Sequence, residues 1–294
     1  MIPRAVRDYV TEMAAAYPSV FRTVLRASSY FLPNYWIFNQ LVQQCGGTVI
    51  TKARLGNGMP VLALMGDLVS CDISRSGFHE PEVVDLIRSQ LTPNTVFFDI
   101  GSHIGQYTLL AAHCVVEVHS FEPNPAIFQL LSANVSSNKL SNVRLNNCAV
   151  TDFEGEADFH LANVSNTGQS TLLPAAACAK KCRVRCLSLD YYLRTNNVDL
   201  KGRKVLAKID VEGAELGVVR GASLLLAARP TVLFEILPTT PEQDVRELLS
   251  MFAVAGYKLH GVGSHHRLLP LTDENRSAYS NVLAIPPVDP SHVV

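Results

Sequence analysis

From about residue 95 onward, short apolar runs alternate with segments in which apolar residues recur every three or four positions. The runs at 96–100, 205–211 and 232–236 are apolar at nearly every position, which is typical of strands covered on both faces. The periodic segments predict helices, and this alternation predicts a parallel sheet flanked by helices. We expect strands at 96–100, 118–121, 143–150, 205–211 and 232–236, and helices near 104–113, 125–137, 214–228 and 241–254.

A hairpin and a helix are expected before this core. Residues 48–65 hold two apolar runs around Gly56-Asn57-Gly58, and Asn-Gly supplies the positive φ angles that a tight turn needs. A helix follows at about 81–91, because Pro81 suits a first helical turn and an apolar face comes after it.

The regions around the core suggest three parts. An insertion at about 153–189 has alternating residues and is expected to add edge strands, and the segments at 257–262 and 281–286 predict a closing hairpin. We therefore divide the chain into an N-terminal helical and β-hairpin extension at 1–76, a main domain at 77–286 and a flexible tail at 287–294.

Composition and charge narrow the class of protein. Of 294 residues, 48% are hydrophobic and 17% are charged, which predicts a folded chain with a large core. The formal net charge of -1 provides no long-range field for phosphate backbones, so we do not expect nucleic acid as a partner.

The first residues argue for a cytoplasmic location. Charged residues interrupt the first ten positions, where a secretion signal would need an apolar stretch. The uncharged stretch at 27–51 contains Pro33 and several Asn and Gln residues, so we do not expect a membrane span. Its aromatic residues are expected to pack on the main domain or on a second subunit, or to lie on a membrane surface. Peripheral membrane contact or a homodimer through residues 1–45 is therefore the partner prediction.

The strongest candidate for binding is the segment 95–108. A buried strand runs through Asp99 and Gly101 into a turn, and a helix containing Gly105 follows. Such a turn lies at the carboxyl edge of a parallel sheet, where α/β folds bind ligands, and we expect its glycines because a Cβ would collide with a bound cofactor. Glu122 ends the next strand, 21 positions after Gly101, a spacing that suits a carboxylate binding ribose hydroxyls.

Together these features indicate an adenosine-containing cofactor. The NAD fingerprint fails because His103 and Gln106 occupy its later glycine positions, and no Gly-Lys-Ser/Thr follows for a P-loop. S-adenosylmethionine has no phosphate to bind, and its charged amino acid portion suits an acid at a strand end such as Asp99.

Several motifs in order resemble the FkbM-type methyltransferase family, and the resemblance covers about 77–286. Its most specific element is the run Lys208-Ile-Asp-Val-Glu-Gly-Ala-Glu215 after the glycine motif, and Ser102-His103 departs from the Ala-Asn usual in the family. The other matching segments are Gly77-Phe-His-Glu-Pro81, Phe121-Glu-Pro-Asn-Pro125, Asn134, Ala149-Val-Thr-Asp152 with Gly155, Leu189-Asp190, Gly221 and Arg229-Pro-Thr-Val-Leu-Phe-Glu235.

The resemblance implies an α/β fold of the Rossmann-like class I methyltransferase type. Its sheet would have seven mostly parallel strands, the last antiparallel, with helices on both faces. The implied donor is S-adenosylmethionine, and the usual reaction transfers its methyl group to an oxygen. The residues expected at the donor are Asp99, Gly101, Ser102, Gly105 and Tyr107 for the methionine side and its turn, Glu122 for the ribose, and Ala149, Val150 and Asp152 for the adenine.

Charged residues at the end of the fourth parallel strand are the candidates for catalysis. Lys208, Asp210 and Glu212 alternate and are therefore expected to point to one side of it. Methyl transfer to a hydroxyl requires alignment of the acceptor and removal of a proton. We expect Asp210 to act as base or to orient the acceptor, Glu212 to assist, and Lys208 to hold a carboxylate or substrate oxygen. A self-satisfied Lys-Asp-Glu cluster that closes the sheet edge is the alternative.

Other titratable residues are weaker candidates. His103 lies in the cofactor turn and could accept a proton, while His79 and the pair His265-His266 are considered because histidine titrates near neutrality. Glu235 ends the neighbouring strand and could join Asp210 and Glu212. Three carboxylates could hold a divalent metal, but the sequence does not distinguish this from an ion-pair network, so we assign no metal ligand.

The sequence therefore predicts an S-adenosylmethionine-dependent methyltransferase that acts on a hydroxyl of a small molecule, sugar or glycolipid. A nucleotide-dependent oxidoreductase and a non-catalytic adenosine-binding scaffold are the alternatives. The first would bind nicotinamide, and the second would tolerate loss of Asp210 and Glu212.

Overall fold

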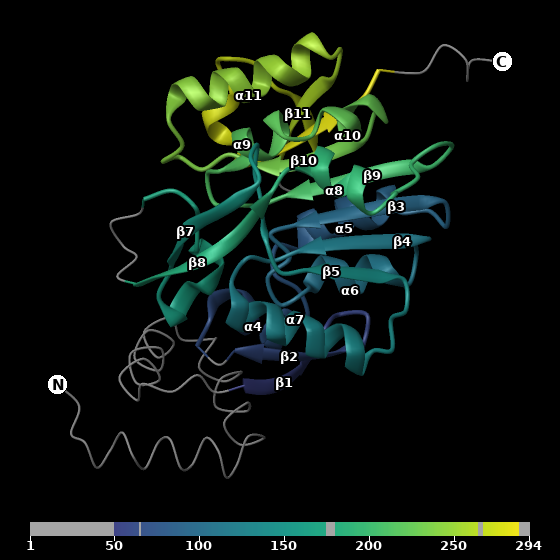
Figure 1. Ribbon diagram of the computed structural model, residues 1–294, viewed down its shortest axis with the longest axis vertical. Coiled ribbons are helices and arrows are strands. Elements are labelled where there is room, and N and C mark those ends of the chain that lie inside the picture. Colours follow the sequence, from purple (N-terminus) through teal and green to yellow (C-terminus); the bar gives the residue numbers. More distant parts are fainter. Residues whose placement is uncertain (1–49, 65, 175–179, 264–266, 288–294) are drawn as a thin grey trace.

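The computed structural model describes residues 50–64, 66–174, 180–263 and 267–287. An eight-stranded sheet forms the centre, in the order β12-β11-β13-β10-β9-β3-β4-β5, with helices on both of its faces (Figure 1). Its strands are β3 (Thr95–Ile100), β4 (Glu117–Phe121), β5 (Val143–Asn146), β9 (Lys204–Ile209), β10 (Thr231–Glu235), β11 (Lys258–Val262), β12 (Leu268–Pro270) and β13 (Asn281–Ile285).

The strand directions confirm the Rossmann-like class of fold. Strands β5, β4, β3, β9 and β10 run parallel, whereas β13 pairs antiparallel with both β10 and β11. The predicted closing hairpin is thus present, and β12 adds an eighth strand beyond the seven expected. Strand order reverses at β3, which has β4 on one side and β9 on the other. Loops leaving β3 and β9 therefore diverge, and this divergence leaves room for a ligand.

Alternate residues of β3 explain why its sequence is apolar throughout. All six of its residues are buried. Phe98 and Ile100 belong to the core on one face of the sheet, whereas Phe97 belongs to the core on the other face. Both faces are covered by helices, as the unbroken apolar run predicts. These helices are α5 (Pro81–Gln90), α6 (Gln106–Ala112), α7 (Pro125–Ser137), α8 (Leu189–Thr195), α9 (Glu215–Arg220), α10 (Ser223–Ala227) and α11 (Glu242–Val254).

The helix expected at 214–228 is interrupted at Gly221, between α9 and α10. A Cβ on Gly221 would lie 2.2 Å from the carbonyl oxygen of Thr151, so this backbone packs directly against the loop after β6. The carbonyl of Gly221 also accepts a hydrogen bond from the amide of Asp190. Tertiary packing, which the helical periodicity does not reveal, therefore divides the segment.

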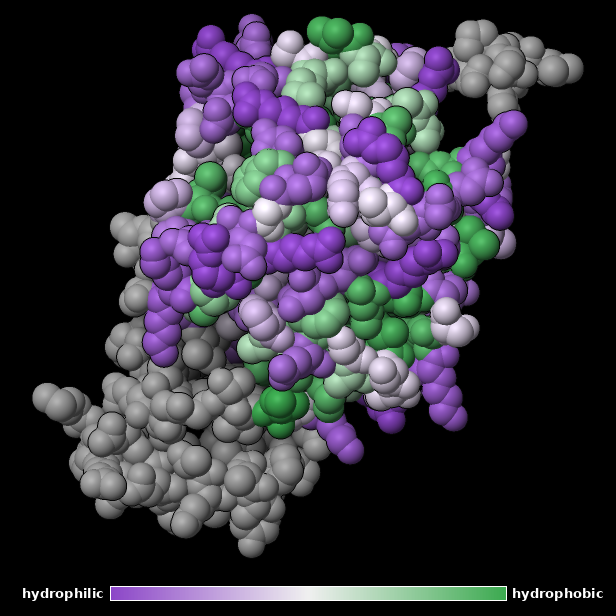
Figure 2. Space-filling view, viewed as in Figure 1, coloured by the Kyte–Doolittle hydropathy of each residue, from purple (hydrophilic) through white to green (hydrophobic). Residues whose placement is uncertain are grey.

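The insertion forms a sheet of its own instead of adding edge strands to the main sheet. Its strands β7 (Gly155–Leu161) and β8 (Lys180–Leu187) form this sheet with β6 (Ala149–Val150), which lies just before the insertion, in the order β6-β8-β7. The strand expected at 143–150 is consequently split, because β5 ends at Asn146 and β6 pairs with β8. The surface over β7 and β8 is hydrophilic (Figure 2), while Phe159 and Val184 pack inward.

The predicted hairpin at the N-terminal side is confirmed by β1 (Ile50–Arg54) and β2 (Pro60–Leu64), and α4 (Leu68–Ser76) follows it. Asn134 on α7 fixes this hairpin, since its side chain bonds both the amide and the carbonyl of Leu62. Its amide also donates to the carbonyl of Ile104 at the turn before α6. This packing places α4 beside the carboxyl edge of the main sheet.

Some predictions fall outside the described residues. They include the aromatic cluster, the contact through 1–45, the pair His265-His266 and the tail from 288. Within the ranges that are described, no helix has the length and apolar character needed to cross a membrane.

Candidate functional site

A cavity of about 240 Å³ opens at the carboxyl ends of β3, β4 and β9. Two sets of residues contribute to its wall. The glycine-turn group consists of the turn Gly101–Ile104, Glu122 and Ala149–Val150. The carboxylate group consists of Lys208, Asp210, Glu212 and Glu235.

Gly101 begins the turn after β3 with a φ of +85°. A Cβ at this position would lie 1.8 Å from the carbonyl oxygen of Asp210. The expected reason for this glycine, contact with a cofactor, is therefore incomplete: the chain's own backbone already excludes a side chain. At Gly105, with a φ of +95°, a Cβ would meet the Leu131 side chain at 2.6 Å.

Glu122 and the glycine turn face one another directly. The Glu122 carboxylate accepts hydrogen bonds from the backbone amides of His103, at 2.9 Å, and Asn124, at 2.8 Å. Burial raises the pKa of Glu122 to about 7, although both amide hydrogen bonds act in the opposite direction. The spacing argument thus identified a carboxylate that lies across the turn at the cavity wall.

Three residues that the resemblance placed at the donor, Asp99, Asp152 and Tyr107, either lie outside the cavity wall or contact other side chains. Asp99 is fully buried, accepts a hydrogen bond from the Thr108 hydroxyl at 2.6 Å, and does not line the cavity. Asp152 is exposed and also lies outside the wall. Tyr107 lines the cavity, but its ring lies against Lys208, whose Nζ is 4.6 Å from the ring centroid.

The carboxylate group is built around an ion pair. The ammonium of Lys208, which is 3% exposed, donates to Asp210 Oδ2 at 2.5 Å. Burial alone would raise the pKa of Asp210, but the Lys208 charge and a hydrogen bond with Glu235 bring this pKa below its ordinary value. Asp210 is therefore ionised at neutral pH.

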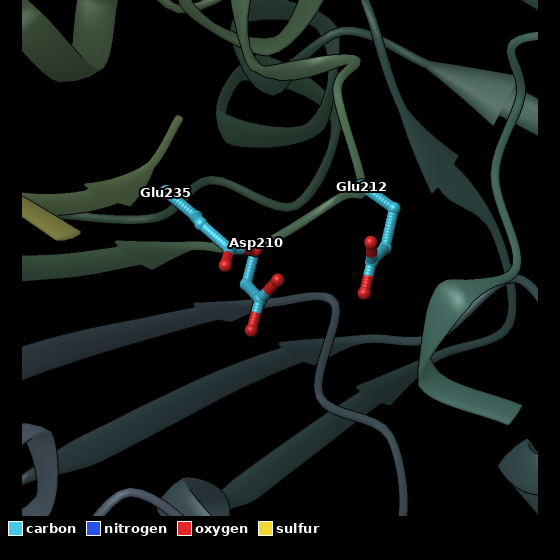
Figure 3. A group of neighbouring side chains, drawn as sticks. All are labelled: Asp210, Glu212 and Glu235. Atoms are coloured by element: carbon cyan, nitrogen blue, oxygen red, sulfur yellow. The ribbon is translucent and has the colours of Figure 1, made fainter. Parts of the chain in front are cut away.

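Glu212 and Glu235 have the opposite tendency. Burial and the neighbouring charge of Asp210 raise the pKa of Glu212 to about 8 and that of Glu235 to about 9. Figure 3 shows the carboxyl group of Glu235 beside that of Asp210, with Glu212 on the neighbouring turn, and one oxygen of each residue lies within 4.8 Å of the others. This distance would suit a divalent cation, yet Lys208 already supplies a positive charge to Asp210.

The expectation that Asp210 and Glu212 alternate along a strand is wrong, because β9 ends at Ile209. Both residues occupy the turn that follows, where Glu212 has a φ of +56°. Glu215 maintains this turn by accepting hydrogen bonds from the amides of Val211 and Gly213. Asp210 and Glu212 therefore meet because of a tight turn instead of strand alternation, and Glu235 joins them from the end of the neighbouring strand β10.

His103 makes one hydrogen bond through its backbone amide, to Glu122, and another through its ring. Its Nε2 lies 2.7 Å from the Thr167 hydroxyl, which itself donates to Asp67 Oδ1. Thr167 must then accept from Nε2, so the proton of a neutral His103 ring resides there. Burial lowers the pKa of His103, and Nδ1 is buried without a hydrogen-bond partner in the described structure. These contacts fit a residue that orders the turn.

The sequence did not identify Glu80, Gln106 or Thr167 as members of this site, although all three line the cavity. Glu80 accepts hydrogen bonds from Tyr107 and Asn281, and its φ is +49°. Only the motif at 77–81 indicated the importance of this region. The small helix at 164–169, which carries Thr167, gave no signal because it contains no recognisable ligand pattern.

Comparison with known proteins identifies the FkbM methyltransferase domain at residues 99–259, more than half of the chain. A 31-O-demethyl-FK506 methyltransferase from Streptomyces tacrolimicus is 31% identical over 168 residues, which are 55% of this chain and 60% of that protein. A hexuronic acid methyltransferase from Haloferax volcanii is 26% identical over 171 residues, 58% of this chain and 68% of the relative.

Solved structures give a weaker likeness. The crystal structure of an FkbM methyltransferase from Methylobacillus flagellatus KT has a TM-score of 0.43 and 15% identity, with 66% of this chain and 44% of that chain covered.

Proposed function

The chain belongs to the FkbM methyltransferase family, and from this premise we propose that it uses S-adenosylmethionine to methylate a hydroxyl group of a small molecule, sugar or glycolipid. The names of the two relatives support oxygen as the acceptor atom, since one acts on a 31-O-demethyl compound and the other on hexuronic acid. The matching region spans about three fifths of the first relative, so the substrate of the whole protein is part of the proposal.

The charge of the cavity supports this donor over a dinucleotide. Five carboxyl side chains line the wall: Glu80, Glu122, Asp210, Glu212 and Glu235. Among the described residues of the wall, Lys208 is the only lysine or arginine, and it is already paired with Asp210. Glu212 and Glu235 are protonated at neutral pH and Lys208 neutralises Asp210, so the described wall offers a pyrophosphate no unpaired lysine or arginine, whereas its carboxyl oxygens can accept hydrogen bonds from the ammonium group of S-adenosylmethionine.

The glycine-turn group suits the adenosine portion. The remaining acceptor sites on the Glu122 carboxylate can bind two ribose hydroxyls, because each carboxylate oxygen has a second lone pair. Phe121, Ala149 and Val150 present an apolar wall to a flat base. When bound, the donor supplies a methyl group on a positively charged sulfur.

The carboxylate group suits the acceptor. Asp210, kept ionised by Lys208, can accept a hydrogen bond from the acceptor hydroxyl and orient its oxygen. A low pKa makes Asp210 a weak base, so of its two predicted roles the structure favours orientation. Glu212 and Glu235, protonated at neutral pH, can donate hydrogen bonds to further oxygens of a polyhydroxylated acceptor.

The observation that carries the proposal is the placement of Glu122 against the glycine turn, in a cavity whose one described lysine is already paired. Methyl transfer from radiolabelled S-adenosylmethionine to a panel of acceptors tests it: 31-O-demethyl-FK506, methyl glucuronide and methyl glucoside. We expect label on at least one hydroxyl of the panel. Binding of NAD without binding of S-adenosylmethionine would refute the proposal.

A further inference from the structure

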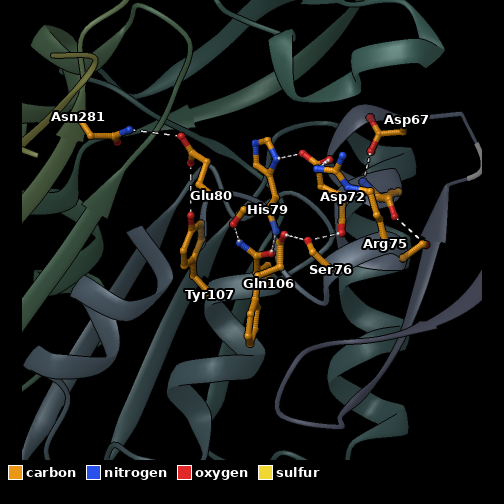
Figure 4. Close-up of polar contacts among 12 residues, drawn as sticks. Asp67, Asp72, Arg75, Ser76, His79, Glu80, Gln106, Tyr107 and Asn281 are labelled. Carbon is orange, nitrogen blue, oxygen red and sulfur yellow. Dashed lines mark hydrogen bonds and ion pairs between the residues drawn. The ribbon is translucent and has the colours of Figure 1, made fainter. Parts of the chain in front are cut away.

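A histidine and an aspartate outside the predicted site form a hydrogen-bonded pair at the cavity. His79 lines the wall, and its Nδ1 lies 2.8 Å from Oδ2 of Asp72 on α4 (Figure 4). Because a carboxylate can only accept, Nδ1 carries the proton and Nε2 presents a lone pair. Within the described part of the chain Nε2 has no hydrogen-bond partner.

The position of His79 is fixed by the first residue of α6. The side chain of Gln106 accepts from the His79 amide at 2.7 Å and donates to the His79 carbonyl at 2.9 Å. Gln106 is 3% exposed, so its amide group has few alternative orientations. A paired contact of this kind holds the imidazole at one place on the wall without using either ring nitrogen.

Asp72 is also positioned from its own helix. Its other oxygen, Oδ1, lies 3.3 Å from Arg75, one turn later. Helix α4 is in turn capped by Asp67, whose Oδ2 accepts from the amide of Ser70. Asp72 therefore presents one oxygen to His79 from a short helix with an ordered first turn.

Charged side chains on each of the elements around His79 affect the pKa of its ring. Asp72 lies on α4 with Arg75, Glu80 precedes α5, and Asp210 follows β9. His103, in the turn before α6, interacts electrostatically with the same ring. Burial lowers the pKa of His79, but the hydrogen bond to Asp72 and the charges of Glu80 and Asp210 outweigh it, so the pKa is raised above its ordinary value.

We propose that His79 is the catalytic base of methyl transfer and that Asp72 is its positioning residue. The inference rests on the proposed function. The acceptor oxygen forms its bond to the methyl carbon, the carbon–sulfur bond breaks with its electron pair left on sulfur, and the hydroxyl proton passes to Nε2 of His79. The Asp72 carboxylate stabilises the resulting imidazolium, as in other carboxylate–histidine pairs.

The other candidates on the wall are less suited to this step. Asp210 is tied to Lys208, and His103 has Nε2 bonded to Thr167 while Nδ1 is buried. Glu212 and Glu235 share their space with a third acid. His79 and His103 both have a fixed tautomer and one unbonded nitrogen, but that nitrogen is buried in His103, whereas the His79 side chain is 26% exposed.

His79→Gln and Asp72→Asn test the proposal in the full chain, with His113→Gln as the control because His113 is exposed at the end of α6. Calorimetry with S-adenosylhomocysteine comes first. We expect all four proteins to bind it alike, and a wild type that does not bind it refutes the proposed function and the base proposal together. Binding by the wild type, followed by normal turnover in His79→Gln, overturns the base proposal alone.

Turnover of the acceptor panel is then measured across pH. We expect His79→Gln to lower kcat at least about a hundredfold with little change in the KM for the donor. Imidazole added to His79→Ala should restore part of the rate. Asp72→Asn should lower kcat about tenfold and move the acidic limb of the pH profile to lower pH, because the ring loses the charge that raises its pKa. An unmoved limb overturns the role of Asp72.

An acceptor-free measurement decides the case if the panel is not methylated. NMR titration of labelled histidines identifies the His79 ring by its absence from the His79→Gln spectrum. We expect this ring to titrate above the ordinary histidine value in the wild type and lower in Asp72→Asn. A ring that titrates below that value, or that does not respond to Asp72→Asn, overturns the proposal.

Discussion

The two groups of residues that line the cavity are built in different ways. In the glycine-turn group, backbone amides are already paired: those of Gly101 and Ser102 donate to the Phe121 carbonyl, and that of His103 donates to Glu122. In the carboxylate group, side chains from separate elements share one ion pair and excess acid.

The glycine-turn group is therefore held rigidly by its backbone, whereas the carboxylate group can take part in proton transfer. The glycine-turn group depends on close backbone packing, so small changes in volume should disturb it. The carboxylate group depends on charge, so substitutions that keep the shape of a side chain should still alter it. The comparison therefore predicts stability losses in one group and turnover or pH effects in the other.

Gly101→Ala should have the largest effect. Its Cβ would overlap the Asp210 carbonyl, and its left-handed φ adds strain, so we expect a loss of about 4 kcal/mol in the free energy of unfolding. Urea denaturation monitored by circular dichroism measures it. Gly58→Ala is the matched control, because Gly58 has a φ of +88° and no atom within 4 Å of the added Cβ. It should lose only about 1 kcal/mol, and equal losses in the two variants would disprove the crowding argument.

Asp210→Asn should come next, and it should act on turnover. The amide keeps the shape of the side chain but removes the charge paired with Lys208, so the acceptor hydroxyl loses its ionised partner. We expect kcat on a methylated acceptor to fall at least about a hundredfold while S-adenosylhomocysteine binding persists. Asp273→Asn, in an exposed turn, is the control. Normal turnover in Asp210→Asn would exclude this residue from the mechanism.

A smaller effect is expected in the pH dependence of stability. The pKa of Glu235 is about 9 in the folded chain against an ordinary value of 4.5, so the folded state holds this proton more tightly than the unfolded state. The contribution of this proton to the free energy of unfolding is complete below about pH 4.5 and is lost as the pH rises through 9. Glu212, with a pKa of about 8, acts in the same direction.

Glu235→Gln should reduce this dependence, because glutamine resembles the protonated acid and does not titrate. Between pH 6 and pH 9, the fall in Tm should be smaller in the variant than in the wild type by about 3 °C. Thermal denaturation at several pH values measures the difference. Parallel Tm curves for the two proteins would show that Glu235 is not protonated in the fold.

The comparison of the two groups also explains which features of the fold and of the site could be predicted from the sequence. The parallel sheet, its helices and the Gly101 to Glu122 spacing are properties of consecutive strand and helix units, and they are visible in apolar runs and local distances. The placement of Glu235 beside Asp210 follows from adjacent parallel strands ending at one edge. These features require knowledge of the sheet but not of side-chain packing.

Other parts of the site arise from contacts with no local pattern. Gln106 fixes His79 across 27 positions, and Thr167 meets Asp67 across 100. The separate sheet formed by β6, β7 and β8 depends on which strand β6 pairs with, and alternation alone does not specify that partner. The strand-end position of Asp99 likewise does not reveal that its Oδ2 accepts a hydrogen bond from Thr108 in the core.

Calorimetric titration of Glu122→Ala and the wild type tests the central claim most directly, with S-adenosylhomocysteine and NAD as ligands and Glu82→Ala, on an exposed position of α5, as the control. We predict that the wild type and Glu82→Ala bind S-adenosylhomocysteine and not NAD, and that Glu122→Ala binds it at least about tenfold more weakly because the ribose loses its charged partner. Binding of NAD alone, or equal affinity of Glu122→Ala and the wild type for S-adenosylhomocysteine, would contradict the account.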